Sequence, residues 1–394
     1  MNMVSGRFDP SSPQSAPPSA SVNISRRQML GGLTAAALAP GSIGTARSAV
    51  SVNRLTHFKR GFNLPGVADT SADQTRLPSA NVLAALKKLG FEAVRLPVDP
   101  GQLLKPGADR TAFLRGLETA FAVIEASGLR IMIDMHPSGT ISDILKSDYR
   151  SGGKLVDSAW RELLPLAAMS NPESTLIEVL NEPQLPASQW PELRQKLIDA
   201  IRSKLSRHTL IWSSANYQTI EETVGDTGPD DENAIAAVHF YYPMIFTHQG
   251  ETWTNDGLSK IRNFPFPSTK GMSSIDQLRS AMEREGQADV VAMIDRETSV
   301  TWDPSRIIDE FSKLKEWSRK TGWPVIINEF GVLRWSAPPN DRALWLQTVR
   351  SVAEANDFGW THWDMDQAFG FMSDRRDAKS IDMQIVKALT GGRR

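Results

Sequence analysis

Two short apolar runs in this sequence each carry a glutamate close to their C-terminal end. Residues 175–183 read TLIEVLNEP and include Glu182, and residues 324–332 read PVIINEFGV and include Glu329. Each run has the length and composition of a buried strand that delivers one carboxylate at its end. Two carboxylates presented in this way suggest an acid/base and a nucleophile that act together.

Other chemically capable side chains lie at the ends of similar apolar runs. In chain order these are Arg95, His136, Asn181, His239, Tyr241 and Trp363. An uncompensated charge inside a protein core is costly, so residues of these types persist there with a partner or at a site. Together with Glu182 and Glu329 they occupy the same end of six runs, which predicts one shared functional site.

The elements that must position these residues alternate between strand and helix patterns. The expected strands cover residues 58–64, 93–98, 129–136, 175–183, 209–215, 235–241, 324–330 and 358–364. The expected helices cover residues 79–89, 111–126, 155–169, 190–205, 304–320, 341–355 and 379–389. Eight strands in this order predict a single α/β domain, a (β/α)8 TIM barrel. A doubly wound open sheet is less favoured, because no Gly-rich phosphate loop follows the first strand.

The longest excursion from this pattern covers residues 243–303, between the sixth strand and its helix. We expect one helix in it, over residues 274–285, and it contains Trp253 and Trp302. A loop of this length inside a compact domain is usually functional.

The ordered series of motifs resembles glycoside hydrolase family 5, the cellulase family of retaining barrel glycosidases with catalytic glutamates on strands four and seven. The matching pieces are RGFN (60–63), VRLPV (94–98), DMHP (134–137), LNEP (180–183), HFY (239–241), NEFG (328–331) and WD (363–364). They follow the family's order along nearly the whole chain after residue 58. A lone NEP would be a weak signal, whereas the ordered series is specific.

The resemblance implies a role for each of the strand-end residues. Glu182 would be the general acid/base, and Glu329 the nucleophile that forms a glycosyl-enzyme. Arg95 would hold Glu329 ionised and oriented. Tyr241 would touch the nucleophile or the ring oxygen, and His239 would lie near the acid/base.

The resemblance also implies three contacts with the sugar at the cleaved bond. Asn181 would donate to its 2-hydroxyl, and His136 would bind other hydroxyls in the −1 subsite. Trp363 would be the platform beneath that sugar. For each of these residues the structural alternative is a satisfied core position.

Other residues are expected to be structural, or are open to either interpretation. Glu178 has the strand parity of Glu182, and Asp134 that of His136, so both should point into the barrel as structural groups. Trp317 and Trp345 fit the core faces of helices. The candidates for stacking on a sugar are Trp212, Trp253, Trp302 and Trp335.

No cofactor and no metal are expected. His136, His239 and the two glutamates could superficially be counted as a ligand set. However, the paired histidines at helical spacing that mark zinc hydrolases are absent from the sequence. The sequence has no cysteine, which excludes disulfides and thiolate metal sites.

The charge balance narrows the class of partner. The chain has 44 basic and 45 acidic residues, for a formal net charge of −1, and the charges are scattered. This pattern does not suggest a nucleic-acid footprint or a polybasic membrane surface. We expect a polysaccharide or oligosaccharide substrate and a monomeric enzyme.

The first 48 residues read as a separate segment that precedes a catalytic domain over residues 49–394. A disordered Ser/Pro-rich stretch leads to Arg26 and Arg27, then to a mild apolar run and to small residues near Ala49. This order is typical of a twin-arginine signal peptide, and the apolar run is too short to remain as a membrane-spanning helix. The sequence therefore predicts export to the periplasm or secretion. A flexible N-terminus with a chance arginine pair is the alternative.

The most favoured activity is endo-acting hydrolysis of a β-1,4-glucan. A β-mannanase or an exo-β-1,3-glucanase would use the same chemistry with different subsites. A non-catalytic carbohydrate-binding barrel is a third class, against which the intact glutamate pair argues. The loop that begins with Tyr242 and Pro243 helps to shape the cleft, and the fold alone does not select among these substrates.

Overall fold

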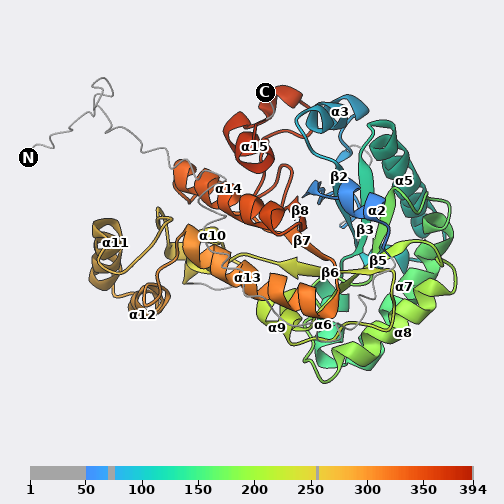
Figure 1. Cartoon of the computed structure of the whole chain (residues 1–394), viewed down its shortest axis with the longest axis horizontal. Helices are drawn as coiled ribbons and strands as arrows, with labels where there is room; N and C mark the ends of the chain where they lie inside the picture. The colour runs from blue at the N-terminus through green and yellow to red at the C-terminus, as the bar shows by residue number, and fades with distance from the viewer. Residues whose placement is uncertain (1–49, 70–75, 254–256, 393–394) are drawn as a thin grey trace, which may run out of the picture. The chain divides into compact units, whose positions relative to one another are not determined.

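Eight parallel strands close into a barrel in which each strand pairs with the next and β1 pairs with β8 (Figure 1). The computed structural model describes residues 50–69, 76–253 and 257–392. The strands are β1 (Arg60–Asn63), β2 (Ala93–Val98), β3 (Arg130–Met135), β4 (Thr175–Glu178), β5 (Thr209–Ser213), β6 (Ala234–His239), β7 (Val325–Glu329) and β8 (Gly359–His362). This architecture confirms the predicted (β/α)8 TIM barrel.

Most of the helices surround the barrel, whereas α11 and α12 lie apart from its wall (Figure 1). Those that the sequence predicted are α3 (Ala80–Lys88), α5 (Gly107–Ala126), α7 (Tyr149–Ala167), α8 (Trp190–Arg202), α11 (Ser273–Arg284), α13 (Pro304–Thr321), α14 (Pro339–Ala355) and α15 (Met383–Thr390). Those that it did not are α2 (Val52–His57), α4 (Pro100–Leu103), α6 (Gly139–Ser147), α9 (Ile220–Val224), α10 (Met244–Thr247) and α12 (Ala288–Glu297), with the short 3₁₀ helices η2 (Asn216–Gln218), η3 (Leu258–Lys260) and η4 (Ala378–Ser380).

Most of the predicted strands are longer than the observed ones. The fourth is the clearest case, because β4 ends at Glu178 although the apolar run continues as far as Leu180. Val179 and Leu180 are fully buried in the loop beyond the strand. The apolar pattern, which reflects burial, therefore predicted too long a strand. The real end of the strand is set by its hydrogen bonds to the neighbouring strands.

Side chains inside the barrel change from apolar to polar along each strand. Ala93, Met132 and Leu176 belong to one apolar cluster, which Phe58 and Val50 join from the segment before β1. Two residues further along the same strands, and therefore on the same face, stand the buried Arg95, Asp134 and Glu178. The barrel interior is thus apolar at the amino ends of the strands and polar at their carboxyl ends.

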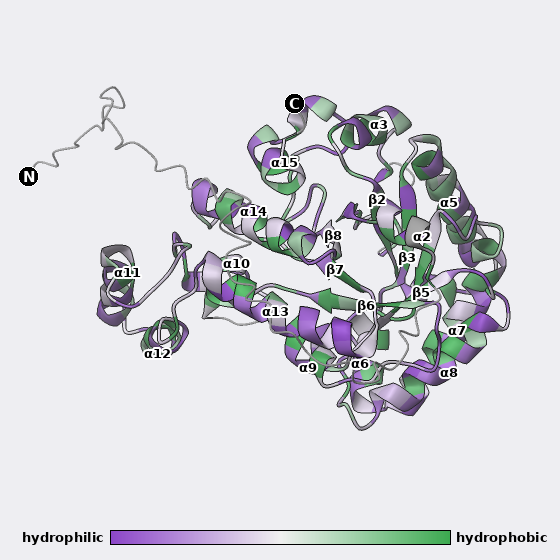
Figure 2. Ribbon diagram, viewed as in Figure 1, coloured by the Kyte–Doolittle hydropathy of each residue, from purple (hydrophilic) through white to green (hydrophobic). Residues whose placement is uncertain are grey.

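The intervening strand residues face a second apolar cluster between the barrel and the helices. Val94, Ile133 and Ile177 belong to it, together with buried residues of the helices such as Leu117 and Trp160. The helices carry both hydrophobic and hydrophilic residues (Figure 2), as expected for amphipathic helices around a barrel.

A close approach between strands requires glycine at position 61. A Cβ atom there would lie 2.5 Å from Thr361 Cγ2 and 2.8 Å from the carbonyl oxygen of Ala93. The glycine of the RGFN motif is therefore a packing requirement that lets β1 lie between β2 and β8.

The predicted export signal and the predicted disorder of the first 48 residues lie outside the described residues, so they stay predictions, as do the predicted domain boundary and monomeric state. Among the helices that the structure describes, none is both long and apolar enough to cross a membrane.

Candidate active site

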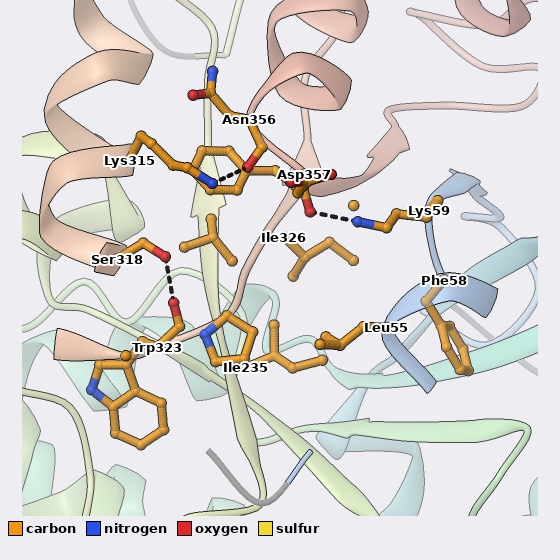
Figure 3. Close-up of a pocket in the computed structure, with 15 residues that line it drawn as sticks. Leu55, Phe58, Lys59, Ile235, Lys315, Ser318, Trp323, Ile326, Asn356 and Asp357 are labelled. Atoms are coloured by element: carbon orange, nitrogen blue, oxygen red, sulfur yellow. Dashed lines mark hydrogen bonds between the residues drawn. The ribbon is translucent and has the colours of Figure 1, made fainter. Parts of the chain in front are cut away.

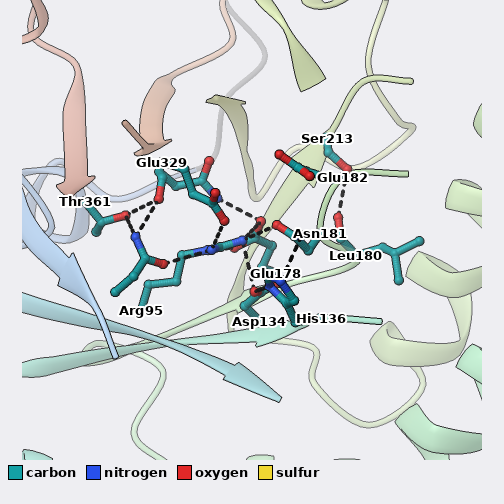
Figure 4. A network of polar contacts seen from close by, with 12 residues as sticks. Arg95, Asp134, His136, Glu178, Leu180, Asn181, Glu182, Ser213, Glu329 and Thr361 are labelled. Atoms are coloured by element: carbon teal, nitrogen blue, oxygen red, sulfur yellow. Dashed lines mark hydrogen bonds and ion pairs between the residues drawn. The ribbon is translucent and has the colours of Figure 1, made fainter. Parts of the chain in front are cut away.

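The carboxyl ends of the strands bring all eight strand-end residues into one region. Figure 4 shows Arg95, His136, Asn181, Glu182 and Glu329 with the groups beneath them. Arg95 lies within β2, and His239 and Glu329 are the last residues of β6 and β7. The other five follow strands directly or within four residues: His136, Asn181, Glu182, Tyr241 and Trp363. The grouping expected from the sequence is therefore present in space.

Glu182 does not project from its strand in the way that strand parity suggests. β4 ends four residues earlier, and Glu182 has a left-handed backbone with φ of 37°. Its Oε1 lies 2.7 Å from Nδ1 of His239 in a hydrogen bond. Burial raises the pKa of Glu182 to about 7, against the positive charges of His136 and Arg95. The carboxyl group is therefore protonated in mildly acidic solution.

Glu329 is almost fully buried, and both of its oxygens accept hydrogen bonds. Nη1 of Arg95 donates to Oε1 at 2.6 Å, and the hydroxyl of Tyr241 donates to Oε2 at 2.9 Å. Burial, together with the nearby Glu329 carboxylate, raises the pKa of Tyr241 well above its ordinary value, so its phenol keeps the proton it donates. These two donors orient the carboxylate of Glu329.

A β-bulge places His239 beside both glutamates. The register of β6 against β7 shifts between Val238 and His239, so that His239 pairs with Glu329. Its Nδ1 lies 3.5 Å from the carboxylate of Glu329 as well as 2.7 Å from Glu182. Burial lowers the pKa of His239 to about 3, so the ring is neutral.

Arg95 is the centre of the network beneath the two glutamates (Figure 4). Its Nε and Nη2 donate to the two oxygens of Glu178 at 2.6 and 2.9 Å, and Nη2 lies 3.0 Å from Asp134 Oδ2. Nη1 also donates to Asn63 and Nη2 to Asn181, at 2.9 and 2.7 Å. One buried guanidinium thus faces three carboxylates, counting that of Glu329.

Burial and carboxylate partners set the charges in this network. Burial raises the pKa of Glu178, and the guanidinium of Arg95 opposes the rise. Burial opposes the charged form of Arg95, but Asp134, Glu178 and Glu329 outweigh it and raise the arginine pKa well above its ordinary value. Glu178 and Asp134 lie inside the barrel, where the sequence predicted structural groups.

Two neighbours of His136 favour different protonation states of its ring. Burial favours the neutral ring, but Asp134, 2.7 Å from Nδ1, outweighs it and raises the pKa of His136 to about 9. The side-chain oxygen of Asn181 faces Arg95, so its NH₂ group faces Nε2 of His136 at 3.3 Å. That bond requires a neutral ring with its proton on Nδ1, whereas the raised pKa favours the charged ring, so Asn181 and Asp134 favour opposite protonation states of His136.

Trp363 lies against His136, with ring centroids 5.7 Å apart and planes inclined by 16°. The backbone of Trp363 passes close to Gly331, where a Cβ atom would lie 2.2 Å from the Trp363 carbonyl oxygen. The glycine of the NEFG motif therefore lets the loops after β7 and β8 meet beside the site.

Three further polar residues support the site, and the sequence assigned none of them a role. Asn63 donates to the carbonyls of Asn328 and His362 at 3.1 and 3.2 Å. Asn328, in β7, and Gln218, in η2, are fully buried. Asn63 and Asn328 each lie in a quoted motif, RGFN and NEFG, which is a usable signal, whereas no sequence motif marks Gln218.

The tryptophans proposed for sugar stacking divide into two groups. Trp212 was a wrong candidate, because it is fully buried on the helix-facing side of β5, packed on Trp323 with ring centroids 5.4 Å apart. Its neighbours Ile211 and Ser213 have the opposite parity.

The other candidates lie outside the barrel core. Trp253 and Trp335 are exposed, and Trp302 stacks on Tyr242 with ring centroids 6.1 Å apart. Trp317 and Trp345 are core residues, as expected.

A cavity of about 180 Å³ adjoins the loop that carries Glu182. Its wall includes His136, Ser142, Asn181, Glu182 and Gln184. A larger cavity of about 260 Å³ lies at the opposite end of the barrel (Figure 3). There Lys315 and Lys59 already donate to the backbone carbonyls of Asn356 and Asp357. The smaller cavity is the better candidate, because chemically active groups converge on it.

Glu182, His239 and Glu329 could also be regarded as metal ligands. One donor atom from each lies within 4.8 Å of the others. Each of these groups already has a protein partner, and the arginine that contacts Glu329 at 2.6 Å would repel a cation. The arrangement therefore fits a proton-transfer and nucleophilic site better than a metal centre.

Comparison with known proteins yields both a family and a fold. The model of the cellulase family, glycosyl hydrolase family 5, matches residues 55–369. Endoglucanase 3 of Fibrobacter succinogenes is 26% identical over 316 residues, which are 75% of this chain and 47% of that protein. This chain therefore spans about half the length of that relative.

Two other proteins match along nearly their whole length. Endoglucanase C of Acetivibrio thermocellus is 23% identical over 351 residues, which are 85% of this chain and 98% of that protein. The crystal structure of endoglucanase Cel5A from Thermotoga maritima has a TM-score of 0.69 at 22% identity, and the match covers 85% of this chain and 98% of the other. At this identity the structural likeness shows the fold.

Proposed function

The chain belongs to the cellulase family, glycosyl hydrolase family 5, and we propose that it is a retaining endo-β-1,4-glucanase. The observation that carries the retaining mechanism is the spacing of the two glutamates. A carboxylate oxygen of Glu182 lies within 4.8 Å of one of Glu329. Retaining glycosidases hold their carboxyl groups about 5–5.5 Å apart, whereas inverting enzymes leave about 6.5–9.5 Å for a water molecule.

The first step of the proposed reaction forms a glycosyl-enzyme. A carboxylate oxygen of Glu329 attacks the anomeric carbon while the bond to the leaving oxygen breaks. Glu182, whose pKa of about 7 leaves it protonated in mildly acidic solution, gives its proton to that oxygen. The shortened glucan then departs as an alcohol with a free hydroxyl group.

The second step releases the sugar and restores both carboxyl groups. Glu182, now ionised, takes a proton from water as the water oxygen attacks the anomeric carbon. The bond to Glu329 breaks and the carboxylate returns to its two donors, Arg95 and Tyr241. Two inversions at one carbon give net retention.

The choice of glucan rests on the relatives and on the aromatic rings around the cleft. The relatives named above are called endoglucanases. Trp253 and Trp335 are exposed on loops that follow β6 and β7, and Trp363 lies beside His136. Aromatic faces of this kind suit the C–H faces of glucosyl rings.

The test combines a substrate panel with trapping of the intermediate. We expect faster hydrolysis of carboxymethylcellulose and barley glucan than of mannan or laminarin, with a rapid fall in viscosity from internal cleavage. A 2-deoxy-2-fluoro cellobioside should label Glu329, as peptide mapping would show. A preference for mannan or laminarin would overturn the substrate, and a label on another residue would overturn the mechanism.

The activity should depend on pH through Glu182. Because the acid must be protonated in the first step, kcat/KM on a cello-oligosaccharide should fall as the pH rises through about 7. An aryl cellobioside with a very good leaving group needs little protonation, so its first step should lose less over the same range. Equal falls for both substrates would assign the alkaline limb to another group.

Removal of the acid should discriminate among leaving groups. For Glu182→Ala we expect a loss of about 10²–10⁴-fold in kcat/KM for cello-oligosaccharides and a much smaller loss for dinitrophenyl cellobioside. The ratio of the two losses, measured at one pH, checks the role. A uniform loss across leaving groups would contradict the assignment of Glu182 as the acid.

A further inference from the structure

Three consecutive residues between β5 and α9 have left-handed backbones. The φ values of Asn216, Tyr217 and Gln218 are 44°, 66° and 48°. Residues other than glycine seldom adopt this conformation, because Cβ then approaches a backbone carbonyl oxygen. Such conformations persist where the surrounding structure fixes them, and they gather at functional sites.

Hydrogen bonds fix this turn on both sides. The backbone N–H of Asn216 donates to Leu185 O at 3.3 Å, and its side-chain amide donates to Glu222 Oε1 at 2.8 Å. The N–H of Gln218 donates back to Ala215 O at 3.0 Å. The side chain of Gln218 is thereby turned into the protein, where it is fully buried.

The buried amide of Gln218 connects the loop that carries Glu182 with β7, which carries Glu329. The backbone N–H of Glu182 donates to Gln218 Oε1 at 2.9 Å. Nε2 of Gln218 donates to Oδ1 of Asn328 at 3.4 Å, and Nδ2 of Asn328 donates to Glu178 Oε1 at 2.8 Å. Asn328 directly precedes Glu329 in β7, so the series of hydrogen bonds runs from the Glu182 loop to the strand that carries Glu329.

The donors and acceptors in this chain have a single consistent order. Glu178 accepts from Arg95 through both oxygens, so the amide of Asn328 must present its NH₂ group to that carboxylate. Its oxygen then faces the NH₂ group of Gln218, whose own oxygen is left for the backbone N–H of Glu182. Both ends of this series of hydrogen bonds require the same orientation of the Gln218 amide. A carboxylate at position 218 could accept from the N–H of Glu182 but could not donate to Asn328.

We propose that Gln218 is a positioning residue that holds Glu182 at the distance from Glu329 that retention requires. The inference rests on the proposed function and deepens it. Glu182 has a left-handed backbone, and Gln218 accepts from its N–H. Without that acceptor the loop relaxes and the carboxyl group leaves Nδ1 of His239. Glu329 keeps its place, because Asn328 retains its bonds to Glu178 and to Asn63.

The first test is Gln218→Met, which keeps the side-chain length and removes both amide bonds. Because a displacement of about 1 Å costs about 100-fold, we expect kcat/KM on cello-oligosaccharides to fall by about 100-fold. The loss of kcat/KM on dinitrophenyl cellobioside should be much smaller, because the first step with that substrate needs little help from Glu182. The two rates, measured on one preparation, supply the comparison.

The matched control is Thr223→Val. Thr223 is fully buried on α9 of the same segment and donates to Thr219 O at 2.8 Å, without touching the Gln218 chain. Thr223→Val should be less stable than the wild-type protein, with no change in the ratio of its rates on cello-oligosaccharides and on dinitrophenyl cellobioside. If Gln218→Met changes that ratio no more than this control does, Gln218 is merely structural and the proposal fails.

Gln218→Glu provides a second variant of nearly equal size. Its second oxygen would face the oxygen of Asn328, so we expect the same dependence on leaving group as for Gln218→Met. If Gln218→Glu shows the same dependence on the leaving group as the wild-type enzyme, an amide at position 218 is not required.

A crystal structure of Gln218→Met separates this proposal from the proposed function, because it requires no turnover. We expect the carboxyl group of Glu182 to have left hydrogen-bonding distance of His239 Nδ1, which is 2.7 Å here. An unmoved Glu182 would overturn the positioning role even in an active enzyme. A moved Glu182 in a protein that cleaves no glycan would uphold the geometry and reject the proposed function.

Discussion

Glu329→Gln should abolish turnover while it preserves the fold. The amide has the size of the carboxylate but cannot form the glycosyl-enzyme, so we expect kcat on an aryl cellobioside to fall roughly 10⁵-fold. Arg95 keeps the carboxylates of Glu178 and Asp134, so the network should survive. The measurements are steady-state rates and thermal unfolding of the same samples.

The matched control for this variant is Glu310→Gln. Glu310 is also a buried glutamate, but it lies on α13, where it pairs with Arg306 and Lys313. It should change stability and leave kcat within a factor of about two. Turnover by Glu329→Gln at a rate close to that of the control would exclude Glu329 as the nucleophile.

Arg95→Met should damage both activity and stability. It leaves the buried carboxylates of Glu178, Asp134 and Glu329 without their cation, and breaking a buried ion pair from one side costs about 3–5 kcal/mol. It also removes the donor that orients Glu329, so we expect kcat to fall by at least about 100-fold. Denaturant unfolding and steady-state rates would measure the two effects.

The stability deficit of Arg95→Met should shrink as the pH is lowered. Burial raises the pKa of Glu178 above its value in an unfolded chain, and loss of Arg95 removes the charge that opposes this rise. A carboxyl group whose pKa is higher in the folded state destabilises the fold above its unfolded pKa and ceases to do so when it is protonated. A deficit that does not change with pH would show that lost packing, not unpaired charge, dominates.

Arg194→Met separates stability from activity in this comparison. Arg194 is buried, pairs with Asp226 at 2.7 and 3.0 Å, and lies over the ring of Trp212, away from the glutamate pair. We expect it to be destabilised with its kcat largely intact. If it loses as much kcat as Arg95→Met, the effect of Arg95 on turnover is an indirect result of instability.

The sequence was sufficient to predict the barrel, because eight apolar strand patterns separated by helical ones have few other solutions. It was also sufficient to predict which residues gather, since parallel strands bring their carboxyl ends to one rim. Arg95, Glu182 and Glu329 were identified in that way, and the structure places them together. Their catalytic roles stay predictions.

Strand parity was useful within strands and misleading beyond them. It correctly predicted that Glu178 and Asp134 point into the barrel, but it does not apply to Glu182, which lies past the end of β4. The same parity, applied to β5, would have excluded Trp212 as a sugar platform. Ends of strands depend on pairing with neighbours that are distant in sequence, so no local pattern fixes them.

By itself, then, the sequence was enough to predict the fold and to identify both carboxylates of the site, because periodicity and strand-end residue types are local properties. Only the tertiary structure decided how the two carboxylates are held. The 4.8 Å limit on their separation, the neutral His239 and the raised pKa of Glu182 depend on burial and on contacts between different strands. Gln218 meets Glu182 only because a left-handed turn after β5 carries it under the loop after β4.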